Sequence, residues 1–467
     1  MAQAAARAQL RAEITPLKAT AEELAQRLGR NSHNSSQPPS ADPPHTSKRS
    51  RRDPRGRRPG GQPGHAGHTR ALVPVEEVAV VIAVKPARCR RCQHRLEGED
   101  AQPERHQVTA MPPIKPVVTE SQLPQLCCPS CGELTRAEPP VGVPTGGFGP
   151  RVQALTALCT GAYHVSKRPT PQVMADLCGL PFSVGTIVNL EQATVQAVAE
   201  PVAEARAYVP QQPTAYLDET GWREGQQRAW LWTAVTSWVT VFVVRLSRGS
   251  KVAQALLGER FWGDLVTDRW SAYTWYPTWR RQLCGAHLLR DIAAMIERGG
   301  QSQVMGEAVR GQARQMCHGW HRVRDGTLAQ TTVARDRWPI RREVERLLEA
   351  GPPCGVPKTE GMCREILKVR QALGTFVRHD GVDPTNNAAA RAIRPGVLWR
   401  TGSFGTQSAD GSRFVEAMMT VVVTLTQQHR HVLDYLTAAC EAALRGEGAP
   451  SLLPTPAQLA QGMRPAA

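Results

Sequence analysis

The sequence lacks any long run of apolar residues, although 41% of its residues are hydrophobic. A helix that spans a membrane needs about 20 consecutive, mostly apolar residues, and the longest candidate, Val421–Leu425, is far too short. The first residues also lack a compact apolar stretch followed by a small-residue cleavage site, so we do not expect secretion. These absences predict a cytoplasmic chain that has no membrane partner.

Acidic residues are too few to balance the basic ones. The chain has 57 Lys and Arg against 41 Asp and Glu, which gives a formal net charge of +16 at pH 7. This balance is typical of proteins that bind polyanions, although many basic chains bind acidic proteins or membranes instead. The location of the basic residues along the chain is therefore needed to distinguish these classes of partner.

A basic segment precedes the first pair of cysteines. Between Lys48 and Arg70, eight basic residues stand against one acid, Asp53. The surrounding residues 31–72 are rich in Asn, Ser, Pro and Gly and have almost nothing to bury, which predicts a linker that is disordered when free. We interpret the segment as an arm that follows DNA phosphates without sequence preference. The alternative is a merely solvated tail.

The chain has 12 cysteines, and a cytosolic location argues against disulfides. Two CxxC motifs stand out, one reading Cys-Arg-Arg-Cys and the other Cys-Pro-Ser-Cys. Each motif can present two thiolates to one tetrahedral zinc ion. We predict a structural Zn²⁺ in a module over residues 73–140, bound by Cys89, Cys92, Cys128 and Cys131. Redox pairs and unligated core thiols are the alternatives.

Apolar patterns predict the elements that flank these motifs. The valine-rich stretch Val73–Val84 is expected to form a strand, and residues 117–126 a second one. Near the start of the chain, apolar or small residues alternate in steps of four and three from Leu10 to Leu28, which predicts a leucine-zipper-like helix over residues 1–30. That helix would serve self-association, or it would be a short amphipathic helix packed on its own chain.

A helical region is expected over residues 145–205. It contains a short helix, Gln172–Cys178, a Gly-Leu-Pro turn and a second helix that Ser183 would cap. This spacing is that of a helix-turn-helix, a motif that reads DNA in the major groove. An ordinary helical bundle that supports the next domain explains the pattern equally well.

Two aspartates end strand-like runs in the second half of the chain. Asp218 lies in TAYLDET, and Asp268 follows Leu265 and Val266. Two further strand-like runs, RAWLWTAVTS and VTVFVVRLS, lie between them. This order of elements is what an RNase H-like sheet needs to bring two carboxylates together, and such carboxylates can bind a pair of Mg²⁺ ions about 4 Å apart. The alternative is a turn aspartate and a helix-capping aspartate.

The motifs together resemble the insertion-sequence transposases of family sixty-six. The resemblance rests on NSHNSSQPPSADPP, RRPGGQPGHAGHTR, CPSCG, YLDETGW, VTDRWSAY, QLCGAHLLRD, DPTNNAAARAIRP and SFGTQSADGSRFVEAM, which are spread over most of the chain. It implies DNA transposition by a DDE enzyme of the bacterial nucleoid, with metal-dependent strand cleavage and transfer at the element ends. Asp218 and Asp268 would be the first two catalytic acids and would bind Mg²⁺ or Mn²⁺.

The resemblance also implies partners and a framework. The partners would be double-stranded DNA (the terminal inverted repeats and the target), further copies of the chain, and helper proteins encoded by the same element. Cys284 and His287 would belong to the strand-to-helix element that follows the second acid. We interpret them as positional framework rather than metal ligands, because no second pair of ligands lies nearby in the sequence.

The sequence departs from the family at the third acid. The family usually reads Asn-Asn-x-x-Glu-Arg where this chain reads Asn-Asn-Ala-Ala-Ala-Arg, so Ala390 occupies the glutamate position. A methyl group cannot bind Mg²⁺, and the loss of one oxygen ligand should depress strand transfer. Compensation by Glu416 is one alternative. The others are a catalytically impaired DNA-binding remnant and a nuclease on the same fold.

The resulting prediction is a multidomain α/β chain with an RNase H-like catalytic domain. The predicted domains are a zipper-like helix (1–30), a basic linker (31–72), a zinc module (73–140), a helical region (145–205), a catalytic domain (206–430) with a helical insertion at about 300–372, and a C-terminal helix and tail (431–467).

Overall fold

The structure is a computed structural model that describes residues 70–317, 320–324 and 326–460, and, before them, only residues 16, 18, 20, 24, 25, 30, 31 and 35–37. Most of the predicted zipper helix and basic linker therefore lies outside the described residues. The contacts divide the chain into two units, one formed by Met1–Pro43 with Lys115–Ala467 and the other by Pro44–Ile114. No helix in the described part of the chain is long and apolar enough to cross a membrane.

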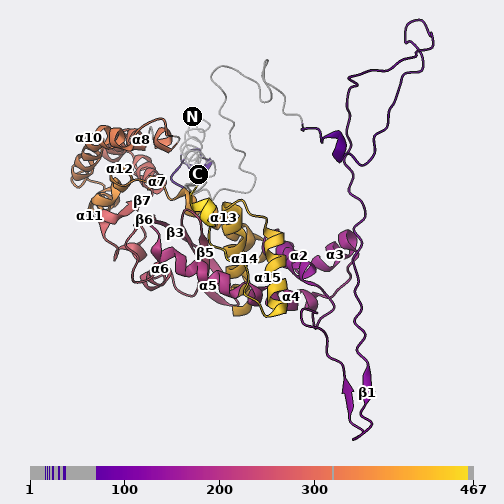
Figure 1. The fold of residues 1–467 in the computed structure, drawn as a ribbon. Coiled ribbons are helices and arrows are strands. Elements are labelled where there is room, and N and C mark those ends of the chain that lie inside the picture. The colour runs from indigo at the N-terminus through magenta and orange to yellow at the C-terminus, as the bar shows by residue number, and fades with distance from the viewer. Residues whose placement is uncertain are drawn as a thin grey trace, which may run out of the picture. The chain divides into compact units, whose positions relative to one another are not determined.

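A mixed sheet of five strands forms the centre of the larger unit (Figure 1). Its order is β5-β4-β3-β6-β7; the first three strands are antiparallel, and β6 and β7 run parallel to β3. The strands are β3 (Thr214–Glu224), β4 (Gln227–Val235), β5 (Thr240–Arg245), β6 (Asp264–Thr267) and β7 (Arg281–Leu283). The chain is thus an α/β protein, as the sequence predicts.

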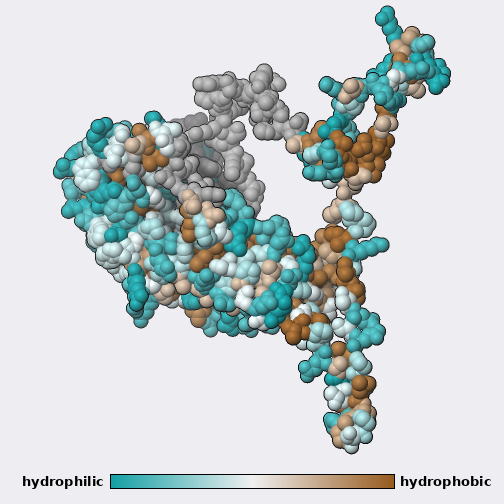
Figure 2. Space-filling view, viewed as in Figure 1, coloured by the Kyte–Doolittle hydropathy of each residue, from teal (hydrophilic) through white to brown (hydrophobic). Residues whose placement is uncertain are grey.

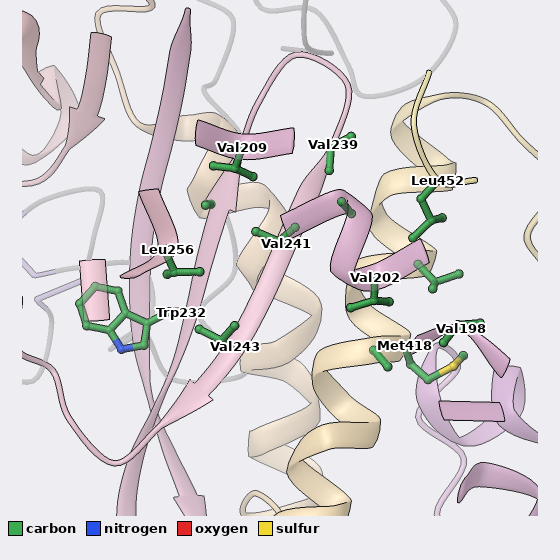
Figure 3. Packing of buried hydrophobic residues seen from close by; sticks show 14 of the residues in the cluster. Val198, Val202, Val209, Trp232, Val239, Val241, Val243, Leu256, Met418 and Leu452 are labelled. Atoms are coloured by element: carbon green, nitrogen blue, oxygen red, sulfur yellow. The ribbon is translucent and has the colours of Figure 1, made fainter. Parts of the chain in front are cut away.

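The apolar runs of β4 and β5 form strands because both faces of the sheet are covered. Trp232, Val241 and Val243 are buried in the largest core cluster together with Val202 of α5 and Met418 of α14. Figure 3 shows these residues on their strands and helices. The helices that carry this cluster are α2 (Pro150–Gly161), α4 (Val184–Ala197), α5 (Ala199–Tyr208), α6 (Ser250–Leu257), α14 (Ala409–Gln427) and α15 (Val432–Arg445).

The β5 edge of the sheet is closed by polar side chains. An edge strand presents backbone N–H groups that need hydrogen-bond partners. Along β5, three side chains of α14, spaced four residues apart, accept these bonds: Glu416 Oε1 from Val244 N (2.7 Å), Thr420 Oγ1 from Phe242 N (3.1 Å) and Thr424 Oγ1 from Thr240 N (3.1 Å). At the other edge, Gln282 Oε1 of β7 accepts from the backbone N of Phe376, in α12 (Thr375–Arg378).

This arrangement gives Glu416 a structural task. It is buried, bonds the edge strand, and pairs with Arg206 and Arg245, each at 2.8 Å. The strands β4 and β5 separate this edge from the far side of β3. The bonds of Glu416 thus give its carboxylate a structural role at the β5 edge.

The predicted helix-turn-helix elements are present. Helix α3 (Thr170–Cys178) ends at Gly179, whose φ of 63° allows the left-handed turn, and Ser183 caps α4 by accepting the N–H of Thr186 at 3.2 Å. Helix α4 also contacts α2, α14 and α15. Its inner side is buried within that bundle, so α4 packs into the helical layer that covers the sheet.

The segment predicted as an insertion is helical in its described residues. Its helices contribute to a core of their own that includes Ile292, Met295, Val344 and Ile366. The first two belong to α7, so the segment is anchored on the helix that follows the sheet. The helices concerned are α7 (Gly285–Glu297), α8 (Gly300–Cys317), α9 (Trp320–Arg324), α10 (Gln330–Glu349) and α11 (Pro357–Lys368).

The strand predicted at Val73–Val84 is wrong. The segment holds a short 3₁₀ helix, η2 (Val75–Glu77), and no strand, and Val84 is 86% exposed. Figure 2 shows hydrophobic side chains gathered on this part of the surface. An apolar alternation forms a strand only where a partner strand is present. The second prediction is right only at its end, because β1 (Gln125–Cys127) pairs with β2 (Leu134–Arg136).

Candidate active site

The register of the parallel strands brings the two predicted acids together. Thr214 of β3 pairs with Asp264 of β6, and Tyr216 pairs with Val266. Continuing this register by two residues places Asp218 beside Asp268, which directly follows β6. Neighbouring strands lie about 4.8 Å apart, so the two carboxylates occupy adjacent positions where β6 ends.

Burial and like charge act together on Asp218. Its pKa is raised to about 8, first by burial and then by the negative charges of Glu219 and Asp268. The backbone N–H of Glu219 donates to Asp218 Oδ1 at 3.0 Å and opposes the shift. Two neighbouring carboxylates of this kind cost free energy unless a cation or a proton lies between them. A divalent cation is therefore a suitable ligand for the pair.

Asp268 is held from two sides. Its Oδ1 accepts the backbone N–H of Trp270 at 2.9 Å, which fixes the carboxylate at the start of a turn. The buried guanidinium of Arg281 donates to the carbonyl oxygen of Asp268 (2.7 Å) and to Thr267 Oγ1 (3.0 Å). Burial lowers the pKa of Arg281 to about 10, so the group stays charged at neutral pH. Sequence reasoning missed Arg281, because nothing in its spacing separates it from the other arginines.

A third acid, Glu219, lies beside the pair and already has partners. It is buried, accepts the hydroxyl of Tyr273, and pairs with Arg248 Nη2 at 2.8 Å. Burial and the charge of Asp268 raise its pKa to about 6. These bonds hold Glu219 and Arg248 in a fixed arrangement next to the candidate site. The sequence offers one signal for it, namely that it directly follows Asp218.

The segment that should supply the third acid is docked at this site. Asn386 Nδ2 donates to the carbonyl oxygen of Leu217 (2.7 Å), the residue before Asp218. The backbone N–H of Asn386 lies 3.1 Å from Cys284 Sγ, which fits the predicted framework role of this cysteine. Helix α13 (Asn387–Ser403) then begins, and Ala390 lies one turn above Asn386 on the same face. Ala390, at the position where the resemblance leads us to expect glutamate, is exposed and carries only a methyl group.

His287, in the first turn of α7, interacts electrostatically with Asp268. Its buried Nδ1 has no hydrogen-bond partner, and burial lowers its pKa while the charges of Asp268 and Asp291 oppose this. Within the described parts of the chain, no three His, Cys, Asp or Glu side chains are arranged to hold a metal ion. Among the described residues, Asp218 and Asp268 are thus a pair of carboxylates with no third such side chain arranged beside them.

The two CxxC motifs have the same backbone design. In the first, Cys89 N donates to His94 O (2.8 Å) and Gln93 N to Cys89 O (3.0 Å), with φ of Gln93 at 60°. The second repeats the pattern: Cys128 N donates to Glu133 O (2.8 Å), Gly132 N donates to Cys128 O (2.9 Å), and φ of Gly132 is 75°. The first motif lies in the unit Pro44–Ile114 and the second in the other unit.

This backbone design favours thiolates. The pKa of Cys89 is lowered by the backbone N–H of Cys92 and then by that of Arg91. The pKa of Cys128 is lowered in the same way by Cys131 and then by Ser130. Since the thiolate is the form that binds metal, each motif by itself is suited to supply zinc ligands.

Comparison with known families gives a match over the part of the chain that holds the sheet. Residues 145–413 match the family described as "Transposase IS66 family". Residues 2–71 match a second family, described as "Family of unknown function (DUF6444)". No curated protein matches the chain. Because the first match covers more than half of the sequence and includes both aspartates, the chain belongs to the IS66 family of transposases.

Proposed function

We propose that this protein cleaves DNA strands at the ends of an insertion sequence and joins them to target DNA. The observation that carries the proposal is the pair of carboxylates, Asp218 and Asp268, which the register of β3 and β6 places side by side. Membership of the IS66 family supports transposition as the process in which they act.

The topology supports an RNase H-like catalytic domain. Three antiparallel strands are followed by two strands parallel to the first, and the first strand lies in the middle of the sheet. The two acids lie on the central strand β3 and directly after its parallel neighbour β6. In open sheets with parallel strands, ligands bind near the carboxyl ends of those strands.

We assign a site for Mg²⁺ or Mn²⁺ to Asp218 and Asp268. Carboxylate oxygens are the ligands that these hard cations prefer. The pKa of Asp218 is raised by burial and then by neighbouring negative charge, which a cation would neutralise. A divalent ion, when bound, polarises a phosphodiester and lowers the pKa of an attacking water or 3′-hydroxyl.

The protein itself orients these groups. The backbone N–H groups of Glu219 and Trp270 each fix one carboxylate oxygen, and Arg281 fixes the main chain at Asp268. The carboxylates are therefore preorganised before DNA arrives, which reduces the reorganisation needed in the transition state. Cleavage and strand transfer would both proceed by in-line attack on a phosphodiester, with no covalent bond to the protein.

The central test is a strand-transfer assay on DNA that carries the inverted repeats flanking the gene, with Mg²⁺ or Mn²⁺. We expect joined products from the wild-type protein and none from Asp218→Ala. Cutting without joining, and without any need for the element ends, would instead identify a nuclease. Joining that persists in Asp218→Ala would overturn the assignment of the site.

Ala390 favours a second candidate, a catalytically impaired transposase that binds element ends. Ala390→Glu would return an oxygen ligand to the face of α13 that is anchored at Leu217 by Asn386. We expect this variant to join strands faster than the wild type, with Ala390→Gln, which lacks the charge, as the matched control. Equal rates for all three proteins would mean that position 390 supplies no ligand.

We also propose a structural Zn²⁺ bound by Cys89, Cys92, Cys128 and Cys131. The matching turns of the two CxxC motifs and the lowered pKa values of Cys89 and Cys128 support it. Metal analysis of the purified protein should find zinc, and Cys128→Ser should reduce it while Cys127→Ser, its exposed neighbour, should not. Folded protein without zinc would contradict the proposal.

The partners follow from the same function. Double-stranded DNA, as element ends and as target, is the substrate, and a net charge of +16 suits a polyanion. Further copies of the chain and helper proteins encoded by the same element are proposed as partners in the assembly on DNA.

A further inference from the structure

A small pocket opens beside the candidate active site. It has a volume of about 370 Å³ and is lined by Arg248, Gly249, Ser250, Trp270, Ser271 and Ala272. Three of these residues lie between β5 and the start of α6, and the other three follow Asp268 within four positions. Because the backbone N–H of Trp270 donates to Asp268 Oδ1, the pocket and the carboxylate share one turn of the chain.

The pocket contains two stacked planar groups. The guanidinium of Arg248 lies over the Trp270 ring, 3.9 Å from its centroid. The indole Nε1 donates to the carbonyl oxygen of Arg248 (3.3 Å), and the guanidinium is paired with the buried Glu219 (2.8 Å). Both planes are therefore fixed by partners, while the Trp270 ring stays 39% exposed.

A stacked indole and guanidinium form a surface for nucleobases. Aromatic rings and arginine planes stack on bases of any sequence, because every base has a π face. Ser250 and Ser271 add hydroxyl groups to the lining, and the first turn of α6 carries no acid that would repel a phosphate.

The stacking surface selects the state of the ligand. A base inside a duplex already has both faces stacked on neighbouring bases, so its π face is not free to lie on a protein ring. A pocket of about 370 Å³ lies at the lower end of the range for small-molecule sites and suits a ligand of the size of one nucleotide. A nucleotide that stacks here must therefore be unpaired.

We propose that this pocket binds one unpaired nucleotide of the DNA strand, next to the phosphate that the carboxylates engage, with its base stacked against Trp270 and Arg248. The inference rests on the proposed function, because it takes DNA as the substrate. A strand whose phosphate lies at Asp268 places its neighbouring nucleotide at Trp270. The pocket thereby holds the strand in line and separates it from its complement.

The test measures binding, so it does not depend on the activity of this copy. A fluorescein-labelled duplex of mixed sequence is compared with the same duplex carrying a few unpaired nucleotides at one end, by fluorescence anisotropy. We expect the wild type to bind the unpaired end more tightly, and Trp270→Ala to lose about tenfold on that probe, since stacking on one aromatic residue contributes roughly this much.

Two further variants control for the aromatic plane and for the loss of a tryptophan outside the pocket. Trp270→Phe keeps an aromatic plane and should retain the preference for the unpaired end. Trp262→Ala removes another exposed tryptophan that also contacts an arginine, Arg280, at 5.1 Å, and should bind both probes as the wild type does. Thermal unfolding confirms that each variant is folded.

The outcomes separate the two proposals. Equal affinity of the wild type for both probes, or an unchanged preference in folded Trp270→Ala, would overturn the nucleotide pocket and leave the proposed transposase function standing. A wild-type protein that binds neither probe would overturn both. Loss of the preference in Trp270→Ala and its retention in Trp270→Phe and Trp262→Ala would support the pocket.

Discussion

The two ends of strand β6 carry the same residue in opposite situations. Asp264 at the amino end is 8% exposed, and its Oδ1 lies 2.7 Å from Nδ1 of His379. Asp268 at the carboxyl end accepts a backbone N–H and faces a second carboxylate, Asp218. Asp264 already has a side-chain partner and therefore stabilises the fold. Asp268 lies beside a second negative charge and is therefore available to bind a ligand.

The same contrast holds for two arginine–tryptophan clusters in this unit. Before the parallel strands begin, Arg280 lies against the rings of Trp262 and Trp279, at 5.1 and 4.8 Å from their centroids. After β6 ends, Arg248 lies on Trp270. The chemistry is alike, but the second cluster adjoins the carboxylates and lines the pocket described above. Position in the sheet, rather than residue type, distinguishes a candidate site from surface packing.

The largest expected effect comes from Asp268→Asn. We expect strand joining to fall at least about a hundredfold, because a group that stabilises charge in the transition state is lost, while the protein stays folded. The measurement is the joining rate with Mg²⁺, beside a thermal unfolding curve. Unchanged strand joining would show that Asp268 is not needed for the reaction. The proposed difference in role between Asp264 and Asp268 would then be wrong.

Asp264→Ala is the reciprocal change. It leaves His379 without its buried partner, so we expect the free energy of unfolding to fall by about 1–3 kcal/mol. Urea denaturation measures it. Joining per folded molecule should be almost unchanged, and a selective loss of joining would place Asp264 in the active site instead.

For Asp218→Asn in metal-free buffer we expect a smaller effect on stability, and the variant should be more stable than the wild type rather than less. The pKa of Asp218 is about 8 in the folded chain, above its ordinary value of 3.8. A carboxyl with a raised folded pKa makes folding less favourable as the pH rises from the lower value to the higher. The asparagine variant should therefore unfold a few degrees higher at pH 8 and show no gain near pH 3.

The smallest effect is expected for Trp262→Ala. The ring is 61% exposed and lies outside both the pocket and the acids. Stability should change by no more than about 0.5 kcal/mol, and strand joining should stay at the wild-type rate. A large loss of joining in a folded variant would show that the amino-end cluster also handles DNA.

The sequence predicts the acids better than their surroundings. Asp218 and Asp268 are predicted because each follows an apolar run and lies in a motif of the family that the chain resembles, although Asp218 lies within β3 rather than at its end. Glu219 and Arg281 were missed because their importance arises from contacts with residues distant in the chain, such as Arg248 and Asp268. The spacing of residues along the sequence does not reveal contacts between distant residues.

Strand pairing is a second property that a local sequence pattern does not predict. The alternation over Val73–Val84 resembles that of a strand, but a strand exists only when a second segment aligns with it. Glu416 shows the converse. Its place in a helical motif gives no hint that its carboxylate bonds the backbone of β5, more than 170 positions earlier in the chain.

The bonds of α14 along β5 have a consequence for how copies of this chain can associate. A sheet with an open margin can be extended by a strand from another molecule, which is a common route to both specific pairing and aggregation. Here Glu416, Thr420 and Thr424 occupy the donors that such a strand would need along β5. A strand from another copy could pair with β5 only by displacing α14, so the five-stranded sheet keeps its own strand order at this margin as copies join and separate.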